Sequence, residues 1–69
     1  MWILSGEIRG EPIDDIGEWD DLVFRLIETM YAAKFNHREA ETVSYELALA
    51  QRDIGLAGEG FSVRIDELK

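Results

Sequence analysis

The chain has 69 residues, no cysteine, and 15 acidic against 7 basic side chains, so its formal net charge is -8. A chain of this length folds around one core, and we expect residues 1–69 to form a single acidic domain of modest stability. Disulfides and thiolate metal sites are excluded. The charge also disfavours direct binding to nucleic acid or to an anionic membrane, because both carry charge of the same sign.

The composition is typical of a folded, soluble domain. Hydrophobic residues make up 46% of the sequence, which distinguishes it from a disordered acidic tail. No basic segment followed by a long apolar run indicates a signal peptide, and no apolar stretch approaches the ~18 residues that a membrane helix needs. Together with the lack of cysteine, which fits a reducing compartment, these features favour a cytoplasmic location.

Two segments, 2–9 and 61–68, alternate in the way that half-buried β-strands do. Residues 10–12, directly after the first of these strands, contain glycine and proline and are predicted to form a turn. The apolar faces of the two predicted strands consist of Trp2, Leu4 and Ile8 in the first and Phe61, Val63 and Ile65 in the second.

A first helix is predicted over residues 16–34. Asp15 is a suitable N-cap, and Glu18 stands three residues later, at the spacing of a capping box. Trp19 is in phase with the apolar face and is expected in the core, although interface anchors also favour tryptophan. The central apolar face at 100° per residue comprises Ile16, Trp19, Leu22, Val23, Leu26, Ile27, Met30 and Ala33, with Phe24 and Tyr31 on one shoulder.

A second helix is predicted over residues 37–54, with Asn36 as its N-cap and Gly55 just beyond its C-terminus. A loop should come next, at residues 57–60. The stripe that packs on the first helix is Ala40, Val43, Leu47, Ala50 and Ile54. Three further apolar residues, Tyr45, Leu49 and Leu56, fall on nearly the opposite side. Such a patch marks a partner surface, unless the adjoining loop or the chain ends cover it.

The order of elements therefore predicts an α+β fold of the β-α-α-β type. An antiparallel helical hairpin would pack on a two-stranded antiparallel sheet formed by the two terminal strands. A two-stranded sheet has two exposed edges and is marginal alone. Packing on the helices would stabilise it, and so would a second chain that extends the sheet by dimerisation.

Residues 11–21 hold six carboxylates and no lysine or arginine. Adjacent helical residues diverge by about 100°, so Asp20 and Asp21 cannot chelate a metal as a pair, and the spacing of a calcium loop is missing. Acids at a helix N-terminus also stabilise it, by roughly 0.3–1 kcal/mol each. Both partner binding and a purely solubilising, helix-capping role therefore remain open for Glu11, Asp14, Asp15, Glu18, Asp20 and Asp21.

The sequence contains no catalytic motif. Ser5 and Ser44 have no neighbouring histidine, and His37 is the single histidine of the chain, in the first turn of the predicted second helix. The glycine-rich segment 55–60 lacks the Lys-Ser/Thr of a phosphate-binding loop and leads into a strand. We therefore expect no enzyme activity, no catalytic residue, no metal and no cofactor.

These features favour a small acidic protein-interaction module whose partner is another protein with a basic surface. In its concrete form the module is an inhibitor that mimics nucleic acid and blocks the basic surface of a nucleic-acid-binding protein. Phage anti-defence proteins and immunity proteins have this size and charge, which is a likeness of composition alone. The alternative is a homo-oligomeric structural or regulatory protein, such as a homodimer, that uses the outer face of the second helix.

Overall fold

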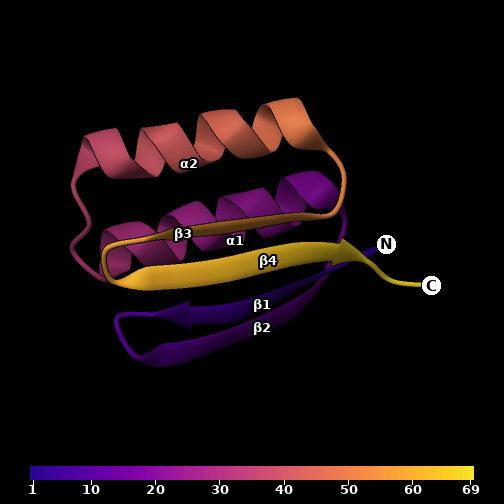
Figure 1. Cartoon of the computed structure of the whole chain (residues 1–69), viewed down its shortest axis with the longest axis horizontal. Helices are drawn as coiled ribbons and strands as arrows, with labels where there is room; N and C mark the ends of the chain where they lie inside the picture. The colour runs from indigo at the N-terminus through magenta and orange to yellow at the C-terminus, as the bar shows by residue number, and fades with distance from the viewer.

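The computed structural model describes all 69 residues as a compact α+β fold with four strands and two helices. The two helices run antiparallel and form one layer, and the strands form the other (Figure 1). In chain order the elements are β1 (Trp2–Ile8), β2 (Glu11–Gly17), α1 (Trp19–Ala32), α2 (His37–Ala50), β3 (Ile54–Gly58) and β4 (Phe61–Glu67).

The sheet has the strand order β2-β1-β4-β3, and every neighbouring pair is antiparallel. The predicted pairing of the terminal strands is confirmed, since Leu4 of β1 faces Ile65 of β4. The prediction of a two-stranded sheet is wrong, because β2 and β3 add one outer strand on each side. The observed order is thus ββααββ. Each central strand forms a hairpin with an outer strand, and a sheet of three or more strands is more stable than an isolated pair.

Residues 11–17 form β2, where the sequence predicts a turn and the beginning of a helix. The chain reverses at Arg9 and Gly10, whose φ angles of 51° and 83° suit a two-residue hairpin turn. Pairing with β1 then satisfies backbone groups that a helix would otherwise have satisfied. Ile16 consequently lies on the strand, 51% exposed, and not on the apolar face of the first helix.

The predicted N-cap role of Asp15 is wrong for the same reason. One carboxylate oxygen of Asp15 accepts a hydrogen bond from the backbone N–H of Ile16, and the other accepts one from Arg25 of α1. The salt bridge with Arg25 ties the outer strand to the helix above it. Helix α1 begins only at Trp19, and its N-cap residue Glu18 makes no side-chain capping bond.

The start of α2 is as predicted and its end is not. The Oδ1 atom of Asn36 accepts a 2.8 Å hydrogen bond from the N–H of Glu39, which confirms the N-cap. The helix stops at Ala50, four residues early, because Gln51 takes a left-handed conformation with φ of 47°. Gly55 is therefore not the residue after the helix. It belongs to β3, which occupies the place of the predicted helix end and loop.

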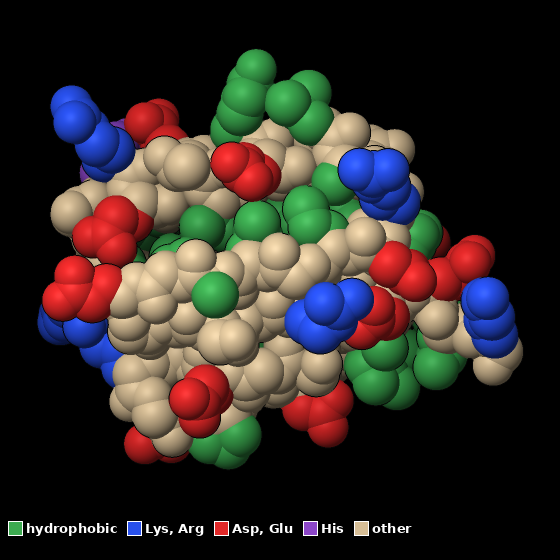
Figure 2. Space-filling model, viewed as in Figure 1, with side chains coloured by type: hydrophobic (Ala, Val, Ile, Leu, Met, Phe, Trp, Pro, Cys, Tyr) green, Lys and Arg blue, Asp and Glu red, His purple; other side chains and the backbone are tan.

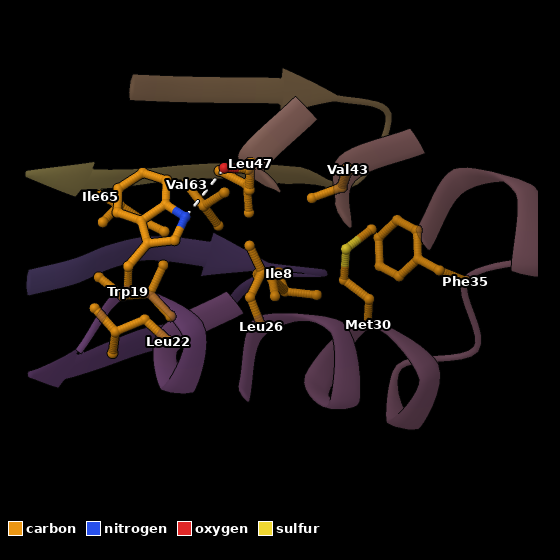
Figure 3. Packing of buried hydrophobic residues seen from close by; sticks show 11 residues of the cluster. Ile8, Trp19, Leu22, Leu26, Met30, Phe35, Val43, Leu47, Val63 and Ile65 are labelled. Carbon is orange, nitrogen blue, oxygen red and sulfur yellow. Dashed lines mark hydrogen bonds between the residues drawn. The ribbon is translucent and has the colours of Figure 1, made fainter. Parts of the chain in front are cut away.

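The hydrophobic core lies between the sheet and the helices (Figure 3). Trp19 is only 7% exposed, which confirms its predicted place in the core, and its ring packs edge-to-face with Trp2 at a centroid distance of 4.8 Å. Its Nε1–H donates a 3.0 Å hydrogen bond to the carbonyl of Leu47. The core cluster comprises Leu4, Ile8, Trp19, Leu22, Leu26, Met30, Phe35, Val43, Leu47, Val63 and Ile65.

Candidate functional site

The structure brings the predicted acidic residues onto two elements that contact each other, β2 and the start of α1. Outer strand β2 carries the first of them, and the others lie at the N-cap and in the first turn of α1, which packs beside β2. All except Asp15 are exposed to solvent. Asp15 differs from the rest because it is half-buried and paired with Arg25. We call the remaining five residues the acidic edge: Glu11, Asp14, Glu18, Asp20 and Asp21.

No carboxylate of the acidic edge forms an ion pair within the protein. The ion pairs of the structure are Arg25–Asp15, His37–Glu41 and Arg64–Asp66. Arg25 of α1 is already paired with Asp15, so these five carboxylates remain without an ion-pair partner and leave a negative potential facing solvent.

Local structural roles account for part of this charge. Residues 18, 20 and 21 stand at the N-terminus of α1, where negative charge stabilises a helix. Asp14 lies on an outer strand, where charge discourages pairing with another chain. These roles explain why acids are tolerated at each position. They do not explain why none of the five carboxylates of the acidic edge forms an ion pair.

A second surface lies on the outer side of α2. Figure 2 shows hydrophobic side chains that project from this helix at the top of the view. Tyr45 and Leu49 are 67% and 70% exposed, so no part of the chain folds over them. Leu56 is placed elsewhere: it lies on β3, is partly buried and packs against the core. The prediction that these three residues share one helical stripe is therefore wrong.

Helix α1 adds exposed apolar residues that the sequence pattern places on the shoulder of its buried face. Phe24 is 67% exposed and Tyr31 is 43% exposed. The sequence indicates this exposure, because the apolar arc covers close to half of the helix and is wider than one flat contact can bury. Both helices thus present aromatic side chains to solvent.

His37 has two partners that the sequence does not reveal. Its Nδ1 atom lies 2.7 Å from the hydroxyl of Tyr31, and its Nε2 atom lies 3.1 Å from a carboxylate oxygen of Glu41. A neutral imidazole protonated on Nε2 satisfies both contacts. All three side chains are exposed, and the contacts connect the end of α1 with the start of α2. No group of three or more His, Asp and Glu side chains is placed to hold a metal ion.

The sheet face opposite the helices carries one cation near β3. Arg64 donates hydrogen bonds of 3.3 Å and 3.0 Å to the carboxylate of Asp66. These bonds and the charge of Asp66 raise the pKa of Arg64 above its ordinary value. The guanidinium lies over Gly55, beside a hollow of about 290 Å³ that Ala57 and Ser62 help to line.

Comparisons with protein-family models, with curated proteins and with solved structures find no match. Neither helix combines the length and the apolar character that crossing a membrane requires. Function is therefore inferred from the acidic edge and from the exposed surfaces themselves.

Proposed function

We propose that this protein is a small acidic interaction module that binds a basic surface of another protein through the acidic edge. The observation that carries the proposal is the set of exposed carboxylates on β2 and the first turn of α1 that have no ion-pair partner. A partner's lysines and arginines can pair with them without displacing an internal cation. The net charge of -8 also accelerates encounter with a basic protein.

The specific form of the proposal is an inhibitor of the phage anti-defence or immunity type. Its partner is a nucleic-acid-binding protein, and its carboxylates occupy the groove that otherwise holds phosphates. Binding by such a groove depends on phosphate charge, so a rigid array of carboxylates competes for the same lysines and arginines. The proposal assigns no reaction, metal or cofactor to this chain.

The test compares two variants that lose the same charge at different places. The edge variant carries Glu11→Gln, Asp14→Asn, Asp20→Asn and Asp21→Asn. The control variant carries four Glu→Gln changes at exposed or half-exposed positions away from the acidic edge: 39, 41, 46 and 59. Each protein is immobilised and exposed to the heparin-binding fraction of a lysate, and retained proteins are eluted with double-stranded DNA.

We expect the parent protein and the control variant to retain proteins that DNA displaces, and the edge variant to lose them. Equal retention by both variants would contradict a role for the acidic edge. Equal loss in both variants would show that net charge matters and its location does not. If retained proteins are not displaced by DNA, the chain is a protein-binding module but does not mimic nucleic acid.

A further inference from the structure

The two outer strands differ in what their free edges offer. Each outer hairpin closes with a two-residue turn, and the residues that flank such a turn exchange both N–H···O bonds. Every second residue along an outer strand therefore directs its N–H and C=O away from the sheet. These residues are Pro12, Asp14 and Ile16 in β2, and Gly55 and Ala57 in β3.

The edge of β2 is closed to a further strand. Pro12 has no N–H to donate, and the N–H of Ile16 already donates a 3.0 Å hydrogen bond to the carboxylate of Asp15. Asp14 keeps a free N–H but places a charge at the middle of the edge. Proline and charge are the devices by which outer strands avoid pairing with another chain.

The edge of β3 has none of these devices. Its sequence from Ile54 to Gly58 contains neither charge nor proline, and it pairs only with β4. Gly55 and Ala57 are exposed, and none of the hydrogen bonds outside the regular ladders involves them. Their backbone donors and acceptors are free, which is the arrangement that invites a partner strand.

We propose that β3 pairs antiparallel with β3 of a second copy of this chain, about a two-fold axis at Leu56. In this register Gly55 of each copy exchanges N–H···O bonds with Ala57 of the other, so every outward backbone group of the strand is satisfied. The two four-stranded sheets become one continuous sheet. Leu56 of each copy faces its mate on the helix side, where it is already partly buried.

The placement of the acidic edge limits the repulsion between two copies that each carry a net charge of -8. The acidic edge adjoins β2, at the opposite end of the strand order from β3, roughly 14 Å away across three strand spacings. Arg52 and Arg64 add positive charge near β3, and Arg64 is already paired with Asp66. Pairing through β3 therefore keeps the two acidic edges at the far ends of the joined sheet.

Helix α2 also supports the second copy as occupant. His37 contacts Tyr31 of α1 and therefore marks the flank of α2 that faces α1. Glu46 lies about 180° from His37 around the helix, and Leu49 lies about 60° from Glu46, between that flank and the solvent side. Because α2 packs beside β3, joining the sheets brings the two α2 helices together and covers part of Leu49.

Sedimentation equilibrium and amide hydrogen exchange test the proposal on the full chain. We expect a species of twice the 7.9 kDa monomer mass at raised concentration. We also expect exchange at Gly55 and Ala57 to slow by about tenfold or more as that species forms. The N–H of Asp14, on the closed edge of β2, serves as the internal control and should remain fast.

Two variants separate edge pairing from other association. Ala57→Pro removes an outward N–H without breaking the β3–β4 ladder, as Pro12 does on β2. It should give a folded monomer, with folding checked by circular dichroism. Ala57→Lys should weaken association too, whereas Ser62→Lys, one strand further in on the same sheet face, should not.

A monomer at all concentrations overturns the proposal, as does a dimer in which Gly55 and Ala57 continue to exchange rapidly. A dimer that survives both substitutions at Ala57 overturns it as well. If Ala57→Pro fails to fold, the exchange rates of the parent protein and the comparison of Ala57→Lys with Ser62→Lys decide the question.

Discussion

At the scale of single residues, Gly6 is the position where the sheet leaves least room. It lies in β1, between β2 and β4, and its φ angle is 131°, a conformation that L side chains rarely adopt. An added Cβ would overlap the carbonyl oxygen of Ser62 and lie 2.7 Å from the Cα atom of Val63. Both atoms belong to the backbone of a central strand, so neither can move aside cheaply.

Gly6→Ala should therefore lower the free energy of unfolding by about 2–5 kcal/mol, from left-handed strain and overpacking together. Urea denaturation followed by circular dichroism measures the loss. Gly10→Ala is the matched control, because its φ angle is 83° and nothing lies within 4 Å of an added Cβ. Similar losses in both variants would show that the contact with β4 contributes nothing.

Trp19 of α1 connects to α2 through a hydrogen bond as well as through packing. Its Nε1–H donates to the carbonyl of Leu47, one of the last four carbonyls of α2, which have no partner inside the helix. The indole therefore satisfies a buried acceptor at the end of α2. This explains why the tryptophan lies inside although acidic residues come next to it in the sequence.

Trp19→Phe should reduce stability by about 1–3 kcal/mol, because a buried carbonyl loses its donor. Trp2→Phe is the control: Trp2 is only partly buried, and its indole N–H makes no hydrogen bond within the chain. Equilibrium unfolding of both variants gives the comparison. If the two substitutions cost the same, packing area and not the hydrogen bond determines the effect.

At the scale of elements, hydrophobic periodicity predicts both helices and the central strand pair. Their signals are strong because each of these elements buries one face against the core. Strand β2 escapes prediction because Asp14 and Asp15 disfavour strands and resemble a helix N-cap. Pairing with β1 and the bond between Asp15 and Arg25 override that local preference.

Strand β3 escapes prediction for a different reason. It has five residues, two of them glycine, and its apolar residues continue the period of the preceding helix. The left-handed conformation of Gln51 ends the helix, and no glycine or proline at that position signals it. Because the pattern extends the helix too far, it assigns Leu56 to a helical stripe and not to the sheet. The free edge of β3 is therefore not visible from the sequence.

The sequence identifies the residues of the acidic edge, with Asp15 in addition, but not their arrangement. Counting acids along residues 11–21 identifies the acidic edge directly. The division of these acids between β2 and the first turn of α1 depends on the pairing of β2 with β1. The pairing of Asp15 with Arg25, which removes Asp15 from that surface, also depends on the fold.

The N-caps of the two helices allow a test at this scale. Asn36 makes a capping bond to Glu39, whereas Glu18 makes none. Asn36→Ala should cost about 1 kcal/mol. Glu18→Ala should cost less, because it removes only a charge at the helix N-terminus. Thermal unfolding compares the two, and a larger loss at Glu18 would contradict the assigned caps.

At the scale of the whole molecule, salt should act in opposite directions on the two proposed associations. Two copies with a net charge of -8 repel each other, and salt screens that repulsion over a length of about 8 Å at physiological ionic strength. Self-association should therefore strengthen as salt rises, whereas binding to a basic partner should weaken. Sedimentation equilibrium and binding titrations in the same salt series measure both trends. Parallel trends would contradict the separate placement of the two surfaces.

The most direct measurement is a heteronuclear NMR titration of the isotope-labelled protein. The added partner is a basic protein that the immobilised parent protein retains and that DNA displaces. We expect the amide resonances of Glu11, Asp14, Glu18, Asp20 and Asp21 to move most, with those around Tyr45 unchanged. Perturbations centred on the outer face of α2, with β2 and the first turn of α1 unaffected, would contradict binding through the acidic edge.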